Sequence, residues 1–118
     1  MVCGRWLRRG AHINAVGANY EHRRELDRDA VLAAATIATD DLEQVRYEST
    51  DLAIPVKHGT LSWDRIVSLG DIVAGKKVAR EYWSDMTLFK SLGVAIEDVA
   101  LAARAYEKAL ASGVGVQL

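Results

Sequence analysis

The sequence predicts an α/β fold, because apolar β-branched runs alternate along the chain with stretches of helical periodicity. Residues 11–18 (AHINAVGA) are almost continuously apolar, which is typical of a strand covered on both faces of a parallel sheet. Shorter runs of this kind occupy residues 36–40 (TIATD) and 86–89 (MTLF). We therefore expect a short parallel sheet, helices between its strands, and one long helix near the C-terminus.

The first predicted strand ends on two small residues, Gly17 and Ala18, and a helix is predicted over residues 23–35 (RRELDRDAVLAAA). Acidic side chains lie toward the start of this segment, where the helix dipole favours them. Its apolar residues have the spacing of one buried stripe: Leu26, Ala30, Val31 and Ala34.

The second predicted strand, residues 36–40, ends in a pair of aspartates. Asp40 and Asp41 can accept hydrogen bonds from the first amides of a helix, which we expect over residues 41–49. A second strand followed by a second helix supports the α/β class.

The middle of the chain is less regular. Residues 50–59 (TDLAIPVKHG) contain Pro55 and Gly59, so this segment is predicted to be a loop between helices. Helical periodicity returns over residues 62–75 (SWDRIVSLGDIVAG), and a further helix is predicted there.

The C-terminal segment has the clearest pattern. After the strand at residues 86–89, the sequence predicts a turn at 91–93 and a long helix over residues 94–113, with Gly113 as its C-terminal cap. Five residues are spaced to form one apolar face: Ile96, Val99, Ala103, Tyr106 and Leu110. The alanines of this segment permit close packing against another helix.

Length and composition predict one domain over residues 1–118. Fifteen basic and sixteen acidic residues give a formal charge of −1, so the chain has no overall field to attract nucleic acid or anionic lipid, and neither is an expected partner. Cys3 is alone, which suits a reducing compartment. Because no segment resembles a secretory signal or a membrane span, we expect a cytoplasmic protein without a membrane partner.

A ligand site is expected where parallel strands end, because loops converge there. Two segments fit, residues 16–19 (VGAN) and 87–93 (TLFKSLG), since each runs from a strand into small residues. Small residues let a backbone approach a ligand closely, and three side chains are expected to supply donors: Asn19, Lys90 and Ser91. The alternative is that the glycines of these segments only close tight turns.

Spacing argues against several other sites. No G-x-G-x-x-G loop opens a helix, because GVGVQL at the chain end has no third glycine. His12, His22 and His58 share no metal-ligand spacing and C-x-x-C is missing, so no metal site is expected. His12 is interpreted as a hydrogen-bonded core residue rather than a base, and Asp40 with Asp41 as capping groups rather than an acid/base pair.

Four segments of the chain resemble one known family. They are residues 10–19 (GAHINAVGAN), 23–26 (RREL), 47–55 (YESTDLAIP) and 87–109 (TLFKSLGVAIEDVALAARAYEKA). In this order and at similar separations they resemble the ornithine cyclodeaminase/mu-crystallin family. The likeness runs from about residue 6 to the final glycines, and it matches only the C-terminal part of that family's proteins.

The resemblance implies a partial Rossmann-like three-layer fold. The C-terminal portion of an NAD(P)-binding Rossmann domain is expected over about residues 10–92, and a returning C-terminal helix over about residues 93–113. Family members are NAD(P)-dependent enzymes that include ornithine cyclodeaminase, ketimine reductases, and alanine and related opine-type dehydrogenases. The Gly-rich pyrophosphate loop, the ribose-binding acid, and the Lys and Arg that hold the substrate carboxylate have no counterpart here. We therefore expect a C-terminal fragment, from a truncated reading frame or a deliberate cut.

The resemblance also assigns roles to residues. Four of them match the strand end that contacts the nicotinamide half of NAD or NADP: Asn14, Ala15, Val16 and Gly17. Arg23 matches a basic cofactor contact, Ser91 a further cofactor contact, and Leu92 a wall of the substrate pocket.

Asn19 departs from the pattern of the cyclodeaminases, in which this position looks like an aspartate that serves as acid/base. An amide cannot exchange a proton near neutral pH, and imine-reducing and mu-crystallin-like relatives also lack the aspartate. The resemblance therefore implies chemistry other than cyclodeamination. Residues 20–22 replace a proline-containing turn, and the usual Pro-Gly before Arg80 is missing, so both loops are expected to differ from the family's.

Two functions follow from these observations. The first is part of an enzyme that transfers hydride between NAD(P)H and a small-molecule imine or amino acid, with weak or no catalysis and cofactor binding by this chain alone. The second is a non-catalytic remnant that acts as a dimerising interaction module, with a homo-oligomer as its expected form.

Overall fold

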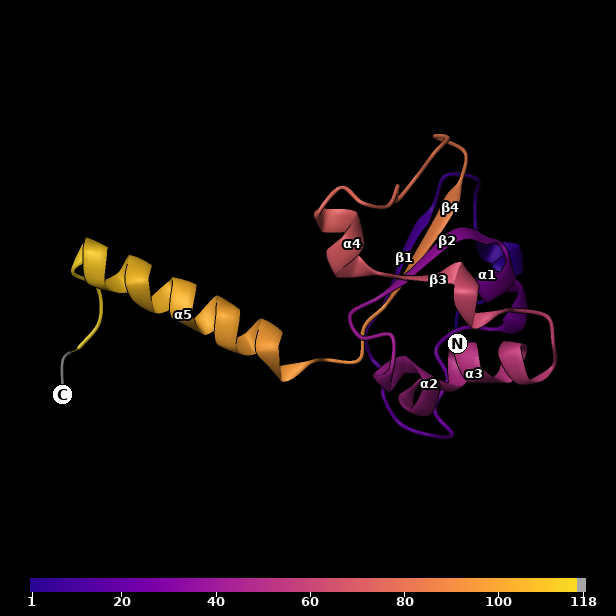
Figure 1. The fold of residues 1–118 in the computed structure, drawn as a ribbon, viewed down its shortest axis with the longest axis horizontal. Helices are drawn as coiled ribbons and strands as arrows, with labels where there is room; N and C mark the ends of the chain where they lie inside the picture. Colours follow the sequence, from indigo (N-terminus) through magenta and orange to yellow (C-terminus); the bar gives the residue numbers. More distant parts are fainter. Residues whose placement is uncertain (117–118) are drawn as a thin grey trace.

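The computed structural model describes residues 1–116. Its centre is a sheet of four parallel strands, in the order β1 (His12–Ala15), β4 (Met86–Lys90), β2 (Ala34–Thr39) and β3 (Ile66–Ser68) (Figure 1). Every neighbouring pair is joined by a crossover, as parallel pairing requires. The predicted α/β class with a short parallel sheet is confirmed.

Helices cover the two faces of the sheet unequally. The short helices α1 (Arg28–Leu32), α2 (Gln44–Glu48) and α3 (Thr50–Lys57) gather on one side of the sheet, and α4 (Leu69–Val73) lies on the other (Figure 1). Two 3-10 turns, η1 (Gly4–Trp6) and η2 (Trp63–Arg65), complete the set. The arrangement is a three-layer fold in which one outer layer is only a single short helix.

The core lies between the sheet and the three-helix side. Ile13, Ile37 and Leu88 point from three neighbouring strands into one apolar cluster, which Val31 of α1 and Leu52 of α3 fill from the other side. Burying large apolar side chains of this kind stabilises the fold by roughly 1.5–3 kcal/mol each. The strand ends are therefore held on a rigid base.

The alternation along β1 corrects one expectation. Ile13 and Ala15 are buried, whereas His12 and Asn14 are exposed. Within the described residues β1 is thus covered on one face only, and it is shorter than residues 11–18. His12 is hydrogen-bonded as expected, but it is not a core residue.

The predicted helix over residues 23–35 is mostly wrong, because only α1 is helical. Asp27 is its N-cap and accepts hydrogen bonds from the amides of Ala30 (2.7 Å) and Gly4 (2.9 Å). Leu26 pairs with Val2 as an isolated parallel bridge, and Ala34 already belongs to β2. Long-range pairing at both ends therefore shortens the helix to five residues.

Two further predictions fail where tertiary contacts override local signals. Residues 50–57 form α3 rather than a loop, and Pro55 lies inside this helix as part of its buried side. Within residues 62–75, the predicted helix is replaced by η2, β3 and α4, since Ile66 and Val67 pair with Ile37 and Ala38 of β2. Ile66 and Val67 contribute to the helical spacing of the segment, but both are β-branched and favour a strand.

The long C-terminal helix is confirmed as α5 (Ala95–Ser112), and Gly113 ends it with a left-handed φ of 63°. None of its residues is buried, and the helix projects away from the sheet (Figure 1). Its apolar face is exposed, including Val99 and Tyr106. No helix among residues 1–116 is long and apolar enough to cross a membrane.

Candidate functional site

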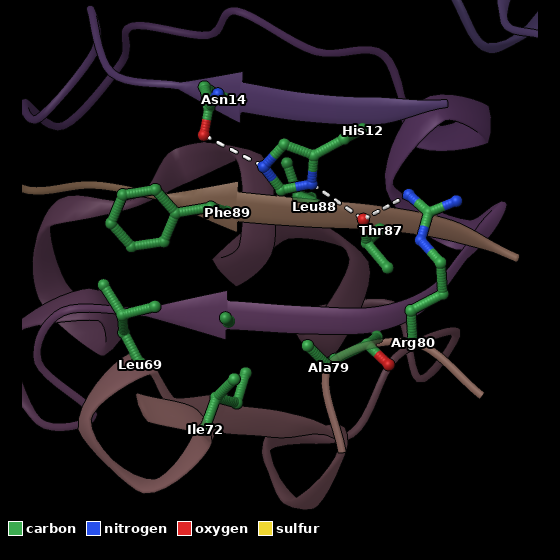
Figure 2. A pocket seen from close by; sticks show the side chains of 11 residues that line it. His12, Asn14, Leu69, Ile72, Ala79, Arg80, Thr87, Leu88 and Phe89 are labelled. Atoms are coloured by element: carbon green, nitrogen blue, oxygen red, sulfur yellow. Dashed lines mark hydrogen bonds between the residues drawn. The ribbon is translucent and has the colours of Figure 1, made fainter. Parts of the chain in front are cut away.

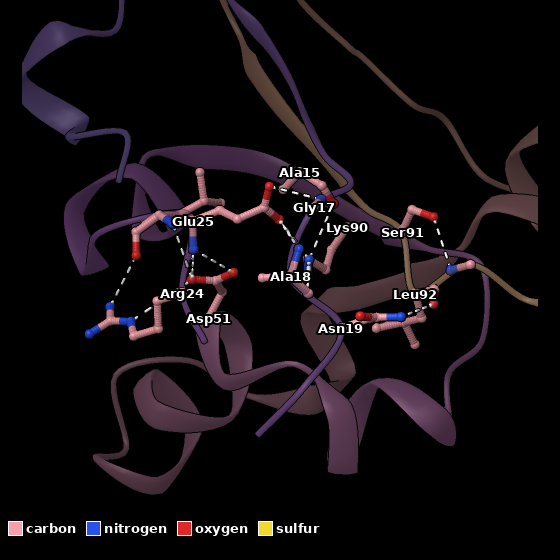
Figure 3. Close-up of polar contacts among 12 residues, drawn as sticks. Ala15, Gly17, Ala18, Asn19, Arg24, Glu25, Asp51, Lys90, Ser91 and Leu92 are labelled. Atoms are coloured by element: carbon pink, nitrogen blue, oxygen red, sulfur yellow. Dashed lines mark hydrogen bonds and ion pairs between the residues drawn. The ribbon is translucent and has the colours of Figure 1, made fainter. Parts of the chain in front are cut away.

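The two segments predicted to form a site lie side by side. Parallel register places Ala15 opposite Lys90, and the Ser91 amide donates to the Ala15 carbonyl over 3.0 Å. Beyond the strands, the Asn19 side-chain amide donates to the Leu92 carbonyl over 3.2 Å (Figure 3). The ends of β1 and β4 therefore form one continuous edge, as parallel strands predict.

The backbone turn after β1 is held by one carboxylate. Glu25 accepts hydrogen bonds from the amides of Gly17 (2.9 Å) and Ala18 (3.0 Å), one on each carboxylate oxygen. A Cβ atom on Gly17 would lie 2.8 Å from the Glu25 Oε1 atom, which is closer than side chains approach. A side chain at this position would therefore displace the Glu25 carboxylate, the flexible end of its side chain, from the turn.

Lys90 reaches the same turn from β4. Its side chain is completely buried, and its ammonium donates to the carbonyls of Ala15 (3.3 Å) and Ala18 and to Glu25 Oε2 (3.0 Å) (Figure 3). A buried ammonium needs such acceptors to offset the loss of water. Lys90 is therefore engaged within the protein, contrary to the expectation that it supplies a donor to a ligand.

The charge state of Glu25 follows from these contacts. Burial acts to raise the pKa of Glu25, but the hydrogen bond from Lys90 and those from the two turn amides outweigh it, so the pKa lies below its ordinary value. Glu25 and Lys90 therefore form an ion pair at neutral pH.

Asp51 anchors the chain on the far side of Glu25. Its buried carboxylate, at the start of α3, accepts hydrogen bonds from the amides of Glu25 and Leu26, each over 3.1 Å to Oδ1. Arg24 Nε lies 3.9 Å from the same oxygen. Burial raises the pKa of Asp51, and the two amide hydrogen bonds offset this only in part.

Asp40, at the end of β2, fixes the turn after β4. Its Oδ2 atom accepts hydrogen bonds from the Ser91 hydroxyl (3.0 Å) and the amides of Leu92 (2.7 Å) and Gly93 (3.2 Å). Asp41 instead accepts from the amides of Glu43 and Gln44 at the start of α2, each over 2.8 Å. The predicted capping role thus applies to Asp41, whereas Asp40 joins two strand ends.

A cavity of about 330 Å³ lies on the opposite face of the sheet, beside α4 (Figure 2). At one end of it, Thr87 Oγ1 lies 2.7 Å from His12 Nδ1 and 3.1 Å from a nitrogen of Arg80, and His12 Nε2 lies 3.1 Å from Asn14 Oδ1. These polar groups bond to one another, and the remaining wall includes Leu69, Ile72 and Phe89. The cavity is therefore mainly an apolar surface.

The family is decided by comparison with known proteins. The family model described as "Ornithine cyclodeaminase/mu-crystallin family" matches residues 1–113. This chain belongs to the ornithine cyclodeaminase/mu-crystallin family.

Individual members of the family are similar in sequence and structure. A Thermococcus litoralis Delta(1)-pyrroline-2-carboxylate reductase, solved with NADH and L-proline, is 46% identical with a TM-score of 0.86, over 99% of this chain and 36% of that one. An archaeal alanine dehydrogenase dimer with bound NAD is 37% identical with a TM-score of 0.81, over 100% of this chain and 37% of that one. Ketimine reductase mu-crystallin of Rattus norvegicus is 39% identical over 107 residues, 91% of this chain and 31% of that protein. The chain thus spans about a third of the length of these family members.

The structure brings most of the family-assigned residues together at the strand ends. Ala15, Gly17, Asn19, Ser91 and Leu92 all take part in the hydrogen bonds described above. Leu92 is only 2% exposed and belongs to the core, and its amide and carbonyl are bonded to Asp40 and Asn19.

Three assigned residues lie apart from this network. Val16 lies in the turn but makes none of these hydrogen bonds, and its apolar side chain is 65% exposed. Asn14 is directed to the cavity on the opposite face, and the exposed Arg23 lies with its guanidinium 5.9 Å from the centre of the Tyr20 ring. In the described part of the chain, no group of three or more His, Cys, Asp or Glu side chains is placed to hold a metal ion.

Sequence reasoning missed the residues that hold the family's strand ends in place. Glu25 lies in a segment that was assigned to a helix, and Asp51 in one assigned to a loop. The one available signal was Lys90, a charged side chain within an apolar strand, which requires a buried partner of opposite charge.

Proposed function

We propose that this chain forms the part of an NAD(P)-dependent oxidoreductase site that places the nicotinamide half of the cofactor against a small imine or amino-acid substrate. The observation that carries the proposal is the turn over residues 15–18, which two charged side chains hold and which presents an exposed apolar side chain at Val16. The similarity to a reductase solved with NADH and L-proline supports it.

The chemistry of the turn fits this role. A bound nicotinamide would supply or accept the hydride. Gly17 has no side chain to cover the backbone at its position, and Val16 adds hydrocarbon surface. A flat ring can therefore lie against the backbone of the turn. The proposed cofactor contacts are Asn14, Ala15, Val16, Gly17, Arg23 and Ser91, and Leu92 is proposed as a wall of the substrate pocket.

Asn19 limits the reaction within this proposal. Its amide donates to the Leu92 carbonyl and cannot exchange a proton with substrate near neutral pH. Its role is to join the two turns, and reduction of an imine or oxidation of an amino acid is favoured over cyclodeamination. We also propose the cytoplasm as the location, and a division into a Rossmann portion and a C-terminal helix.

A chimera tests the proposed function. The chain replaces the corresponding third of the Thermococcus litoralis reductase, and reduction of Delta(1)-pyrroline-2-carboxylate is followed by the loss of NADH absorbance. We expect kcat/KM within about tenfold of the parent enzyme, because the geometry of the turn is preserved. A folded chimera that binds NADH but gives no turnover would contradict the proposal.

Two single substitutions in the chimera, one in the turn and one on the exposed surface of α4, test whether the turn belongs to the site. Gly17→Val places a Cβ 2.8 Å from Glu25 Oε1, so the carboxylate that holds the turn must shift, and we expect kcat/KM to fall by about tenfold or more. Val73→Ala, at an 80% exposed position of α4, should leave kcat/KM unchanged. Equal effects of the two substitutions would remove the turn from the site.

The chain alone is expected to bind NADH weakly or not at all. Cofactor affinity in Rossmann folds depends on a Gly-rich pyrophosphate loop, and this sequence has no G-x-G-x-x-G motif before a helix. Calorimetric titration of the chain with NADH checks this expectation. Micromolar affinity would show that the strand-end turn suffices for binding.

A second function is favoured by the bare surface of α5. Its exposed apolar residues and the unpaired edge of β1 are the surfaces on which a dimerising module would associate. The dimeric form of the similar archaeal alanine dehydrogenase supports a homo-oligomer.

A further inference from the structure

Lys90 is the largest side chain that the fold buries completely, and all of its acceptors lie in one short region of the chain. Two of them, the carbonyls of Ala15 and Ala18, bound the turn after β1, and the third is the Glu25 carboxylate. The ammonium therefore draws both ends of the turn toward β4. An apolar side chain of the same length would leave both carbonyls without this donor.

Glu25 completes the arrangement from the other side. Its carboxylate accepts the amides of Gly17 and Ala18 and pairs with Lys90 over 3.0 Å. Four backbone polar groups of the turn thus bond to only two side chains, the Ala15 and Ala18 carbonyls to Lys90 and the Gly17 and Ala18 amides to Glu25. Charge-assisted hydrogen bonds of this kind are about twice as strong as neutral ones.

These contacts determine what the turn presents to a ligand. The amides of Gly17 and Ala18 point to Glu25, so they are not available to bind a phosphate or carboxylate. What remains outward is the 65% exposed side chain of Val16 and the bare backbone of Gly17. A turn with this surface suits a planar ring rather than an anion.

Asp51 restrains the backbone at Glu25. It accepts hydrogen bonds from the amides of Glu25 and Leu26, and it is itself a buried residue of α3. The carboxylate of Glu25 is therefore presented from a fixed backbone, which is what a positioning group requires.

We propose that Glu25 and Lys90 are positioning residues that hold the turn over residues 15–18 in the conformation that receives the nicotinamide ring. This role rests on the proposed function for its ligand, but the conformation of the turn can be measured on the chain alone.

Amide hydrogen exchange of the full chain tests the proposal. Protection of Gly17 and Ala18 is compared in the native chain, in Glu25→Gln and in Lys90→Met, with Lys76→Met, an exposed lysine paired with Asp71, as the control. We expect protection of the two turn amides to fall by about tenfold or more in both test variants, while core amides such as that of Leu88 keep theirs. The control should match the native chain.

The pH dependence adds a readout that general destabilisation would not change. In the native chain, protection of Gly17 and Ala18 should decrease in acid as Glu25 is protonated. In Glu25→Gln, where Asp51 is the remaining carboxylate that holds this backbone, the decrease should be much smaller. If Lys90→Met does not fold, Glu25→Gln decides the question, since the Glu25 side chain is 27% exposed whereas that of Lys90 is completely buried. Unchanged protection in Glu25→Gln, or an equal loss at Leu88, would overturn the proposal.

The chimera separates this inference from the proposed function. With native turn residues, an inactive chimera counts against the function, whatever the exchange data show. In an active chimera, Glu25→Gln should raise the KM for NADH several-fold more than it lowers kcat. An unchanged KM for NADH with a loosened turn would show that the turn does not receive the cofactor, and would overturn the positioning role.

Discussion

Glu25 and Asp51 are neighbouring carboxylates whose pKa values move in opposite directions. Burial acts to raise both, but Glu25 has an ammonium and two amides as partners, which lower its pKa below the ordinary value. Asp51 is more deeply buried, and its hydrogen bonds from Leu26 and Glu25 do not cancel the cost of burial, so its pKa is raised. The two residues therefore have opposite effects on stability as the pH changes.

The lowered pKa of Glu25 makes the folded chain more stable at neutral pH than in acid. A lowered pKa in the folded chain contributes stability above the unfolded value of 4.5, and this contribution is lost as the pH falls through the folded pKa. Asp51 acts in the opposite sense: its raised pKa favours folding below the unfolded value of 3.8, and that contribution is lost as the pH rises through the folded pKa.

Glu25→Gln should therefore flatten the acid side of the stability profile. Urea unfolding at a series of pH values below and above 4.5 measures the free energy of unfolding. We expect the variant to lose less stability than the native chain as the solution becomes acidic. Glu97→Gln, on the exposed surface of α5, is the matched control, and a native-like slope in Glu25→Gln would contradict the assignment.

Short elements in this chain are defined by what they contact. The turn η1 packs against α1 so closely that a Cβ on Gly4 would lie 2.6 Å from the backbone nitrogen of Ala30. Asp27 joins the two elements by accepting the amides of both Gly4 and Ala30. The N-terminal segment is therefore part of the fold, although no helix or strand was predicted there.

Gly4→Ala should destabilise the chain, because backbone atoms cannot move aside as a flexible side chain can. We expect a loss of about 1–3 kcal/mol in the free energy of unfolding, measured by urea denaturation. Gly70→Ala serves as the control, since the added Cβ meets only the Ser68 hydroxyl, at 3.3 Å, and alanine favours the helix. Equal stability of Gly4→Ala and the native chain would show that η1 is not packed against α1.

The elements that were predicted well are those with the strongest local signals. The strand at 86–89 and the helix at 94–113 match β4 and α5 closely. An apolar run and an uninterrupted helical repeat indicate the type of element without reference to distant residues. The helices predicted at 23–35 and 62–75 failed, since Leu26 and Ile66 are paired with distant residues. Local periodicity does not contain that information.

The whole chain has an uneven shape, with a packed α/β body and one projecting helix. Its extents are 54 × 33 × 27 Å, and α5 accounts for the long direction (Figure 1). The apolar face of α5, predicted from its spacing, is left uncovered: Val99 is 67% and Tyr106 66% exposed. Such a face favours association.

Sedimentation tests this association. We expect the native chain to form a homo-oligomer through α5, and Val99→Glu with Tyr106→Glu to shift it to a monomer, because charges would be placed on the apolar face. Glu107→Gln, an exposed residue of the same helix, should sediment like the native chain. A native chain that stays monomeric at high concentration would argue against the interaction module.

The sequence alone predicts the α/β class, the family, the candidate site at the strand ends and the long amphipathic helix. Each of these depends on a local pattern or a motif. The hydrogen bonds that hold the site come from the folded chain. Glu25 is 65 residues from Lys90 and 26 residues from Asp51 along the sequence, yet the three meet around one turn. Their pairing depends on the parallel register of β1 and β4 and on the docking of α3, and both are set by packing across the core rather than by neighbouring residues.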